Sequence, residues 1–194
     1  MPRLSASGRA PAWAELYDVA APQGGYFTTK QAAGAGYSPM LLSYHVQKGL
    51  LERWGRGIFR VVHFPVSEQE DLVPIWLWSE QKGVFSHETA LALHGLSDAL
   101  PSKHHIMLPG AWSKRRLRPP PETILQYGDL AAHEVAWKEH VPVTTVQRTI
   151  TDCIHAGVGR DLVRQAIAQS VDRGLVDPTD GQVLARMEER HVHS

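Results

Sequence analysis

Histidine and glutamate side chains with the chemistry of metal ligands occur at His87, Glu88 and His94. The zinc-protease pattern places its second histidine four residues after the first, whereas here the interval is seven residues, and no cysteine accompanies them. We therefore expect His87 and Glu88 to form hydrogen bonds near a helix that begins at Ser86, and we predict neither a metal nor a cofactor.

A second polar group surrounds Arg148 and Asp152, which stand four residues apart and can form an ion pair across one helical turn. Several threonines lie nearby, so a catalytic cluster is one interpretation. The sequence order, however, supplies no nucleophile followed by a base and an orienting group. We expect a structural ion pair, and we predict that the protein is not an enzyme.

The densest run of positive charge lies in a loop expected over residues 109–121, and Trp112 precedes it. Three consecutive prolines follow and favour an extended backbone. A solvated loop is one interpretation, and a contact to phosphate or to an acidic partner is the other. The predicted partner-binding residues are Trp112, Lys114, Arg115, Arg116 and Arg118.

Residues 39–48 combine hydrogen-bonding side chains with a helical pattern. The spacing turns Leu42, His45 and Val46 toward the core and Met40, Ser43, Tyr44 and Gln47 outward. Serine, tyrosine and glutamine can bond bases or phosphates, and glutamine can bind adenine through two hydrogen bonds. Tyr44 in the core is the alternative interpretation.

Because this helix itself carries only Lys48, most phosphate affinity must come from cations on other elements. Arginines cluster around the turn Gly55-Arg56-Gly57, and Lys30 precedes them in the chain. The predicted DNA-binding residues are Thr28, Lys30, Met40, Ser43, Tyr44, Gln47, Lys48, Arg53, Arg56 and Arg60.

The elements that must position these residues can be read from start and stop signals. A helix is expected over 12–21, a short one over 29–35 capped by Thr28 or Thr29, and a third over 39–48 with Ser38 as its N-cap. Strands over 50–54 and 58–62 then form a hairpin. This order predicts a winged helix-turn-helix domain in residues 1–66.

Residues 67–194 predict a second, mixed α/β domain, so the fold class is α+β. Helices are expected over 68–82, with Pro74 shortening or kinking it, and over 86–94, 146–156, 160–173 and 180–190. Strands are expected over 104–108, 122–127, 132–137 and 141–143. We assign this domain to a protein partner.

Charge divides the chain in the same place, although the formal net charge is zero. Residues 1–66 hold seven lysines and arginines against three acids, and the remainder holds 13 against 17. Only the first part is therefore suited to phosphate. The single cysteine, Cys153, lies among apolar residues and is expected to be buried. No apolar run is long enough to span a membrane and no signal peptide is evident, so we expect a cytoplasmic protein.

The sequence resembles the AbiEi family of antitoxins. The stretch 25–61 has the family's Phe-Thr-Thr start, its glycines and its closing Gly-hydrophobic-aromatic-Arg pattern, at Gly57 to Arg60. Residues 85–96 are similar to the family's Ser-His-Glu-Ser/Thr-Ala helix, and residues 142–154 to its Val-Thr-x-x-x-Arg-Thr-hydrophobic-x-Asp segment. Many relatives have a third helix richer in arginine, where Ser43, Tyr44 and Gln47 stand here.

The resemblance implies an antitoxin and transcriptional autorepressor. Its winged helix would bind double-stranded operator DNA, with a homodimer as one arrangement, and its second domain would counteract a cognate nucleotidyltransferase-like toxin. The alternatives are a stand-alone transcription factor whose second domain dimerises or senses a ligand, and an enzyme with a degraded nucleotide-handling site.

Overall fold

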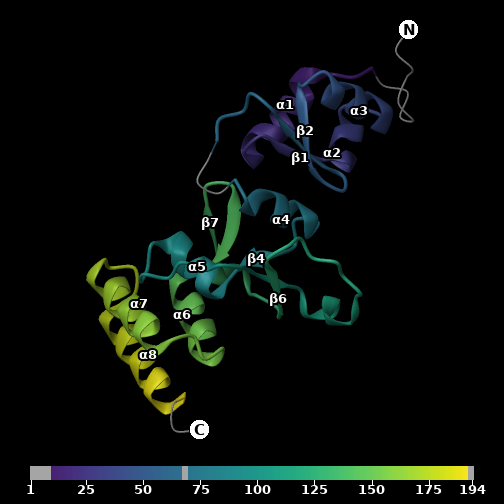
Figure 1. Ribbon diagram of the computed structural model, residues 1–194. Helices are drawn as coiled ribbons and strands as arrows, with labels where there is room; N and C mark the ends of the chain where they lie inside the picture. Colours follow the sequence, from purple (N-terminus) through teal and green to yellow (C-terminus); the bar gives the residue numbers. More distant parts are fainter. Residues whose placement is uncertain (1–9, 67–69, 192–194) are drawn as a thin grey trace. The chain divides into compact units, whose positions relative to one another are not determined.

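The computed structural model describes residues 10–66 and 70–191, which divide into two compact units (Figure 1). The first unit runs to Gln81 and includes Glu139–Val141, and the second comprises Lys82–Lys138 and the residues from Pro142 onward. Both units combine helices with strands, so the predicted α+β class is confirmed. No helix within the described ranges is long and apolar enough to cross a membrane.

The first unit contains the three expected helices and a small sheet. Ser38 caps the third helix, because its side chain accepts a hydrogen bond from the backbone of Leu41. Phe27, Leu42 and Phe59 are among the buried residues that form its core. Its main elements are α1 (Trp13–Ala20), β1 (Tyr26–Thr28), α2 (Thr29–Gly34), α3 (Pro39–Gln47), β2 (Leu51–Gly55) and β3 (Ile58–Val61).

The sheet of this unit has three strands in the order β1-β3-β2, whereas the sequence predicted a two-stranded hairpin. The short strand β1 pairs antiparallel with β3 and places Tyr26 opposite Arg60. The hairpin therefore has its second strand in the middle of the sheet, and all four residues of β3 are buried. Arg60 is one of these four buried residues, and its burial determines which groups it can contact.

The helix α4 (Leu72–Trp78) is shorter than the predicted helix over 68–82, of which residues 67–69 lie outside the described residues. Pro74 lies in its first turn, where a missing backbone N–H costs little, so the proline does not kink the helix. The helix contacts β1 and β3 and is part of the first unit, which thus extends beyond the predicted boundary at residue 66.

The second unit is built on a mixed five-stranded sheet with the order β6-β5-β4-β8-β7. The pairs β4–β8 and β5–β6 are parallel, and β4–β5 is antiparallel. The expected strand over 132–137 is only partly present, since Ala132–Glu134 form a 3-10 turn. The strands are β4 (Val84–Phe85), β5 (His104–Leu108), β6 (Thr123–Tyr127), β7 (Val135–Lys138) and β8 (Val141–Thr144).

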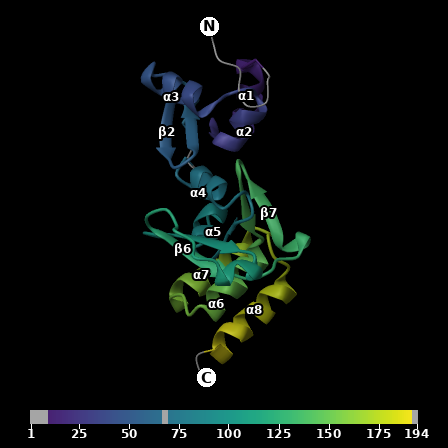
Figure 2. The same ribbon diagram turned by 90° about the vertical axis from the view of Figure 1, so that its right-hand side faces the viewer.

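Four helices complete the second unit, and Figures 1 and 2 show α6, α7 and α8 on the same side of the sheet. They enclose an apolar core that contains Leu91, Ile150, Cys153 and Leu184. Burial raises the pKa of the Cys153 thiol to about 12, so it behaves as a small apolar side chain. The helices are α5 (His87–His94), α6 (Val146–His155), α7 (Arg160–Asp172) and α8 (Pro178–His191).

Candidate nucleic-acid interface

Helix α3 has the two faces that its periodicity predicted. Leu42 is fully buried, while His45 and Val46 are half-buried. On the other face, Met40 is 72% exposed and Tyr44 50% exposed. The alternative that placed Tyr44 in the core is therefore wrong.

The polar side chains of this face differ in what they can still bind. The Ser43 hydroxyl donates a hydrogen bond to the Pro39 carbonyl oxygen at 3.0 Å, within the same helix. Gln47 and Lys48 are exposed, and the Lys48 ammonium lies 5.7 Å from the centre of the Tyr44 ring. The Gln47 side chain forms no hydrogen bond with any described residue, so its amide group is available to a ligand.

The wing consists of β2, the turn at Arg56 and β3. Gly57 in this turn has a left-handed φ of 75°, which glycine adopts without strain. Arg56 is exposed at the tip, and the exposed Arg53 guanidinium lies 5.1 Å from the centre of the Phe59 ring. Trp54, 38% exposed between them, was missed by the sequence analysis, although its position in the predicted wing was available as a signal.

Arg60 was predicted to bind phosphate, and the structure corrects this. Only 7% of Arg60 is exposed; it lies on the central strand β3, and its guanidinium is 5.6 Å from the centre of the Tyr26 ring on β1. Its guanidinium donates to the Phe64 carbonyl oxygen at 3.1 Å and forms an ion pair with Glu70 at 3.4 Å. Arg60 therefore holds the chain after β3 in place and is not available to DNA.

Thr28 has a structural role that accounts for its presence. Its hydroxyl accepts a hydrogen bond from the Gln31 backbone N–H at 3.2 Å, and its own backbone N–H donates to the Gln31 side-chain oxygen at 2.8 Å. This reciprocal capping begins α2. The next residue, Thr29, links the helix to the wing, since its backbone N–H donates to the Gly57 carbonyl oxygen at 2.8 Å.

The bond between Thr29 and Gly57 brings two predicted cations into one neighbourhood, because Lys30 follows the first residue and Arg56 precedes the second. Lys30, Lys48, Arg53 and Arg56 are all exposed. Within the described part of the chain, none of the four forms an ion pair with a carboxylate. Their charges are therefore free to interact with phosphate groups.

The basic loop of the second unit contains a 3-10 turn over Gly110–Lys114. Trp112, predicted to bind a partner, is half-buried, and the Arg115 guanidinium lies 4.1 Å from the centre of its ring. The cations of the loop are all exposed, and none pairs with a carboxylate among the described residues. They are Lys114, Arg115, Arg116 and Arg118.

The two histidines that suggested a metal site do not share a ligand set. His87 Nδ1 lies 2.9 Å from the Ser86 hydroxyl, and its ring stacks against His105 at 5.5 Å between centres. His94 Nε2 instead lies 2.7 Å from the Thr144 carbonyl oxygen. Burial lowers the pKa of all three imidazoles.

The predicted ion pair between Arg148 and Asp152 is confirmed, with 2.8 Å between Nε and Oδ1. A second acid, Glu134, was missed and lies 2.7 Å from the same guanidinium. Glu134 is distant in sequence, so only the packing of the 3-10 turn against α6 reveals it. This paired guanidinium ties two elements of the second unit together.

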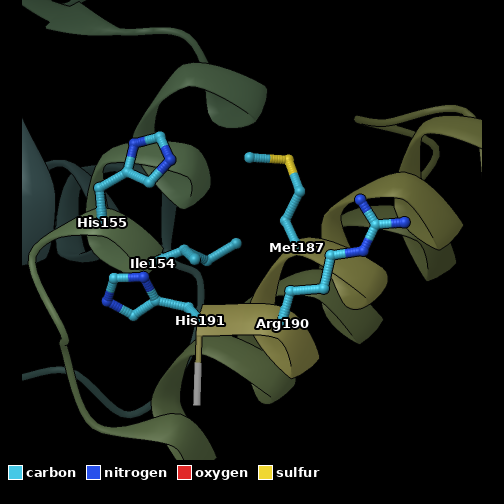
Figure 3. Close-up of a pocket in the computed structure, with 5 residues that line it drawn as sticks. All are labelled: Ile154, His155, Met187, Arg190 and His191. Atoms are coloured by element: carbon cyan, nitrogen blue, oxygen red, sulfur yellow. The ribbon is translucent and has the colours of Figure 1, made fainter. Parts of the chain in front are cut away.

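An open pocket of about 230 Å³ lies between α6 and α8 (Figure 3). His155 and His191 lie on one side of it, Met187 and Arg190 on the other, and Ile154 between them. Ligand pockets usually enclose about 300–1,000 Å³. The pocket is thus smaller and more open than a typical small-molecule site, and the exposed cations of the first unit are the stronger candidate site.

Comparison with known proteins gives one match to a family and one similar structure to report. Residues 15–62 match the family described as "Transcriptional regulator, AbiEi antitoxin". No curated protein matches the chain. The crystal structure of the RV2827C protein from Mycobacterium tuberculosis is similar at 15% sequence identity and a TM-score of 0.48, covering 95% of this chain and 85% of that chain.

The matched segment contains the whole candidate interface, from the N-terminus of α2 through α3 to the wing. The resemblance predicted from the glycines and the wing pattern is confirmed over these residues. The similarity to the AbiEi antitoxin family of transcriptional regulators thus extends over residues 15–62, which match the model of that family.

Proposed function

We propose that this protein is an antitoxin and autorepressor that binds double-stranded operator DNA through α3 and the wing. The single observation that carries the proposal is a group of four exposed cations on α2, α3 and the wing that form no ion pair with the described carboxylates, namely Lys30, Lys48, Arg53 and Arg56. In a winged helix the third helix enters the major groove and the wing contacts the backbone or the minor groove. Cations at these places can bind phosphate while α3 contacts bases.

The antitoxin part of the proposal is supported by the match of residues 15–62 to the AbiEi antitoxin family. We assign the contact with a nucleotidyltransferase-like toxin to the second unit, and within it to Trp112, Lys114, Arg115, Arg116 and Arg118. These cations are exposed and unpaired among the described residues, so they suit an acidic surface on a partner. The alternative is a stand-alone transcription factor, and a test with the toxin separates the two.

The test of DNA binding is a salt titration of the full chain on DNA from upstream of its own gene. Each phosphate contact that is lost should reduce the slope of log K against log salt concentration by about 0.9. The double variant Arg53→Ala, Arg56→Ala should therefore bind more weakly, with a slope reduced by about one to two. Arg186→Ala is the control, because Arg186 is exposed on α8 and bonds only to its own helix. An unchanged affinity and slope in the double variant would contradict the wing assignment.

A further inference from the structure

The part of α3 that is nearest its N-terminus presents an apolar surface. Met40 and Tyr44 stand four residues apart and are therefore neighbours on the same helical face. Met40 is the more exposed of the two, at 72% against 50%. Met40 is thus outside the buried core of the unit, to which Leu42 on the opposite face of the helix belongs.

The hydroxyl beside this apolar surface does not make it polar. The Ser43 hydroxyl donates its hydrogen bond to the Pro39 carbonyl oxygen of the same helix. The other hydrogen-bonding groups of this face lie further along α3, at the hydroxyl of Tyr44 and the amide of Gln47. The N-terminal half of the face thus offers a ligand mainly an apolar contact.

Tyr44 is held in a defined position beside Met40. Its ring lies 5.6 Å from the ring of His45 in an edge-on arrangement, and the Lys48 ammonium lies 5.7 Å from its centre. This places a cation beside the apolar surface, where a phosphate group would bind. The apolar surface and the cation together fit the groove of a duplex better than an apolar protein surface, which would leave Lys48 without a partner.

The chemistry of the major groove limits what Met40 can recognise there. The N-terminal residues of a recognition helix contact the base edges, and Met40 is the second residue of α3. Every base edge in the groove offers hydrogen-bond donors or acceptors, and the apolar feature among them is the methyl group at C5 of thymine. Methionine cannot donate a hydrogen bond and is at best a weak acceptor, so its favourable contact is with a methyl group.

We propose that Met40, supported by Tyr44, is a specificity-determining residue that recognises a pyrimidine C5-methyl group in the major groove. The inference rests on the proposed function, because it requires that α3 binds duplex DNA. The methyl group can belong to thymine or to 5-methylcytosine, and the two sources are distinguished by experiment.

The experiment uses the full chain and duplexes that it selects from a random-sequence pool of unmodified DNA. A selected duplex is resynthesised with each thymine replaced in turn by uracil, which removes only the methyl group. In a second series each cytosine is replaced by 5-methylcytosine. Binding is measured for the unaltered protein, for Met40→Ala and for Gln47→Ala, the last as a control on the same face.

Burial of one methyl group contributes about 0.8 kcal/mol, which corresponds to about a fourfold change in affinity. If thymine is the source, uracil at one or two positions weakens binding about fourfold. If 5-methylcytosine is the source, methylation strengthens binding by the same factor. In both cases Met40→Ala abolishes the difference and Gln47→Ala preserves it.

Two results would overturn the inference while leaving DNA binding intact: equal affinity of the unaltered protein for methylated and unmethylated duplexes, or a methyl effect that persists in Met40→Ala. A full chain that selects no duplex at all would overturn the proposed function instead. Thermal unfolding of Met40→Ala checks that the variant folds, which its exposure leads us to expect.

Discussion

Arg60 is a positive residue of the wing whose charge is directed into the protein. Its guanidinium bonds the carbonyl oxygens of Phe64 and Pro65 and pairs with Glu70, and it lies 5.6 Å from the centre of the Tyr26 ring. Burial raises the pKa of the Tyr26 hydroxyl, so the ring stays neutral beside it. The sequence alone indicated only that an arginine follows an apolar strand, and burial of that strand depends on its pairing with β1.

The difference in burial between Arg60 and Arg56 should appear as a difference in their contributions to stability. We expect Arg60→Ala to lower the free energy of unfolding by about 2–3 kcal/mol, because it removes a buried side chain together with its hydrogen bonds to Phe64 and Pro65 and its ion pair with Glu70. Arg56→Ala should change stability by less than about 0.5 kcal/mol, since its side chain is exposed. Urea unfolding followed by circular dichroism gives both values. Equal stabilities for the two variants would show that the Arg60 contacts do not hold the unit together.

The buried histidines make stability depend on pH. Burial lowers the pKa of His87, His94 and His105 below the ordinary value of 6.5, so the unfolded chain binds protons more readily than the folded one. The contribution of these histidines to the free energy of unfolding should therefore be greatest above about pH 6.5 and should decrease as the pH falls below that value. Urea unfolding at pH 7.5, 6.5 and 5.5 tests this without titrating the carboxylates, which protonate at lower pH.

His94→Gln provides the matched variant for this pH series. Glutamine keeps an N–H that can donate to the Thr144 carbonyl oxygen but has no group that titrates in this range. The variant should lose less stability between pH 7.5 and 5.5 than the unaltered chain. An equal loss in both proteins would remove His94 from the groups responsible.

The start and stop signals of the helices and the order of elements in the first unit could be predicted from sequence, because they are set by local chemistry. Ser38 caps α3 and Thr28 caps α2 wherever the rest of the chain lies. Strand β1 could not be predicted in this way. It has three residues, and its pairing with β3 depends on a contact some thirty residues away.

The turn between α2 and α3 depends on Gly36. Its φ of 86° is left-handed, and a Cβ atom there would lie 2.6 Å from the carbonyl oxygen of Ala10. We expect Gly36→Ala to destabilise the protein by about 2 kcal/mol or more, because a backbone atom cannot move aside as a side chain can. Thermal unfolding should show a lower Tm and, at a temperature where the variant is partly unfolded, weaker DNA binding.

Gly34→Ala is the control for this substitution. Gly34 is two residues away at the end of α2, and a Cβ atom there would meet no other atom within 4 Å. Alanine should leave stability unchanged or raise it by up to about 1 kcal/mol, since it favours helix. A loss as large as that of Gly36→Ala would mean that the turn tolerates no substitution and that steric contact with Ala10 is not the cause.

At the scale of the whole molecule, two groups of exposed cations without a carboxylate partner among the described residues stand out, one in each unit. The first is Lys30, Lys48, Arg53 and Arg56, and the second is the loop 114–118. The remaining arginines of the second unit that hydrogen-bond within it include Arg148, Arg160 and Arg173. Charge asymmetry along the sequence predicted the first group as a phosphate site. Only the structure shows that the cations of both groups form no ion pair with the described carboxylates.

If the two groups of cations serve two partners, substitutions in each should separate two functions of the full chain. Arg53→Ala, Arg56→Ala should relieve repression of a reporter fused to the chain's own promoter, while the protein still rescues growth when co-expressed with a nucleotidyltransferase-like protein encoded beside it. Lys114→Glu, Arg116→Glu should do the reverse, because reversed charge repels an acidic partner. Both variants should keep the Tm of the unaltered protein, since all four side chains are exposed.

The outcomes of this pair distinguish the proposal from its rival. Loss of rescue by the wing variant would mean that neutralisation acts through DNA, and rescue by the loop variant would remove loop 114–118 from the partner surface. If the unaltered protein represses the reporter but rescues growth from no neighbouring protein, the chain acts as a stand-alone regulator. Because one variant is expected to fail only where the other succeeds, a general loss of folding cannot produce the predicted pattern.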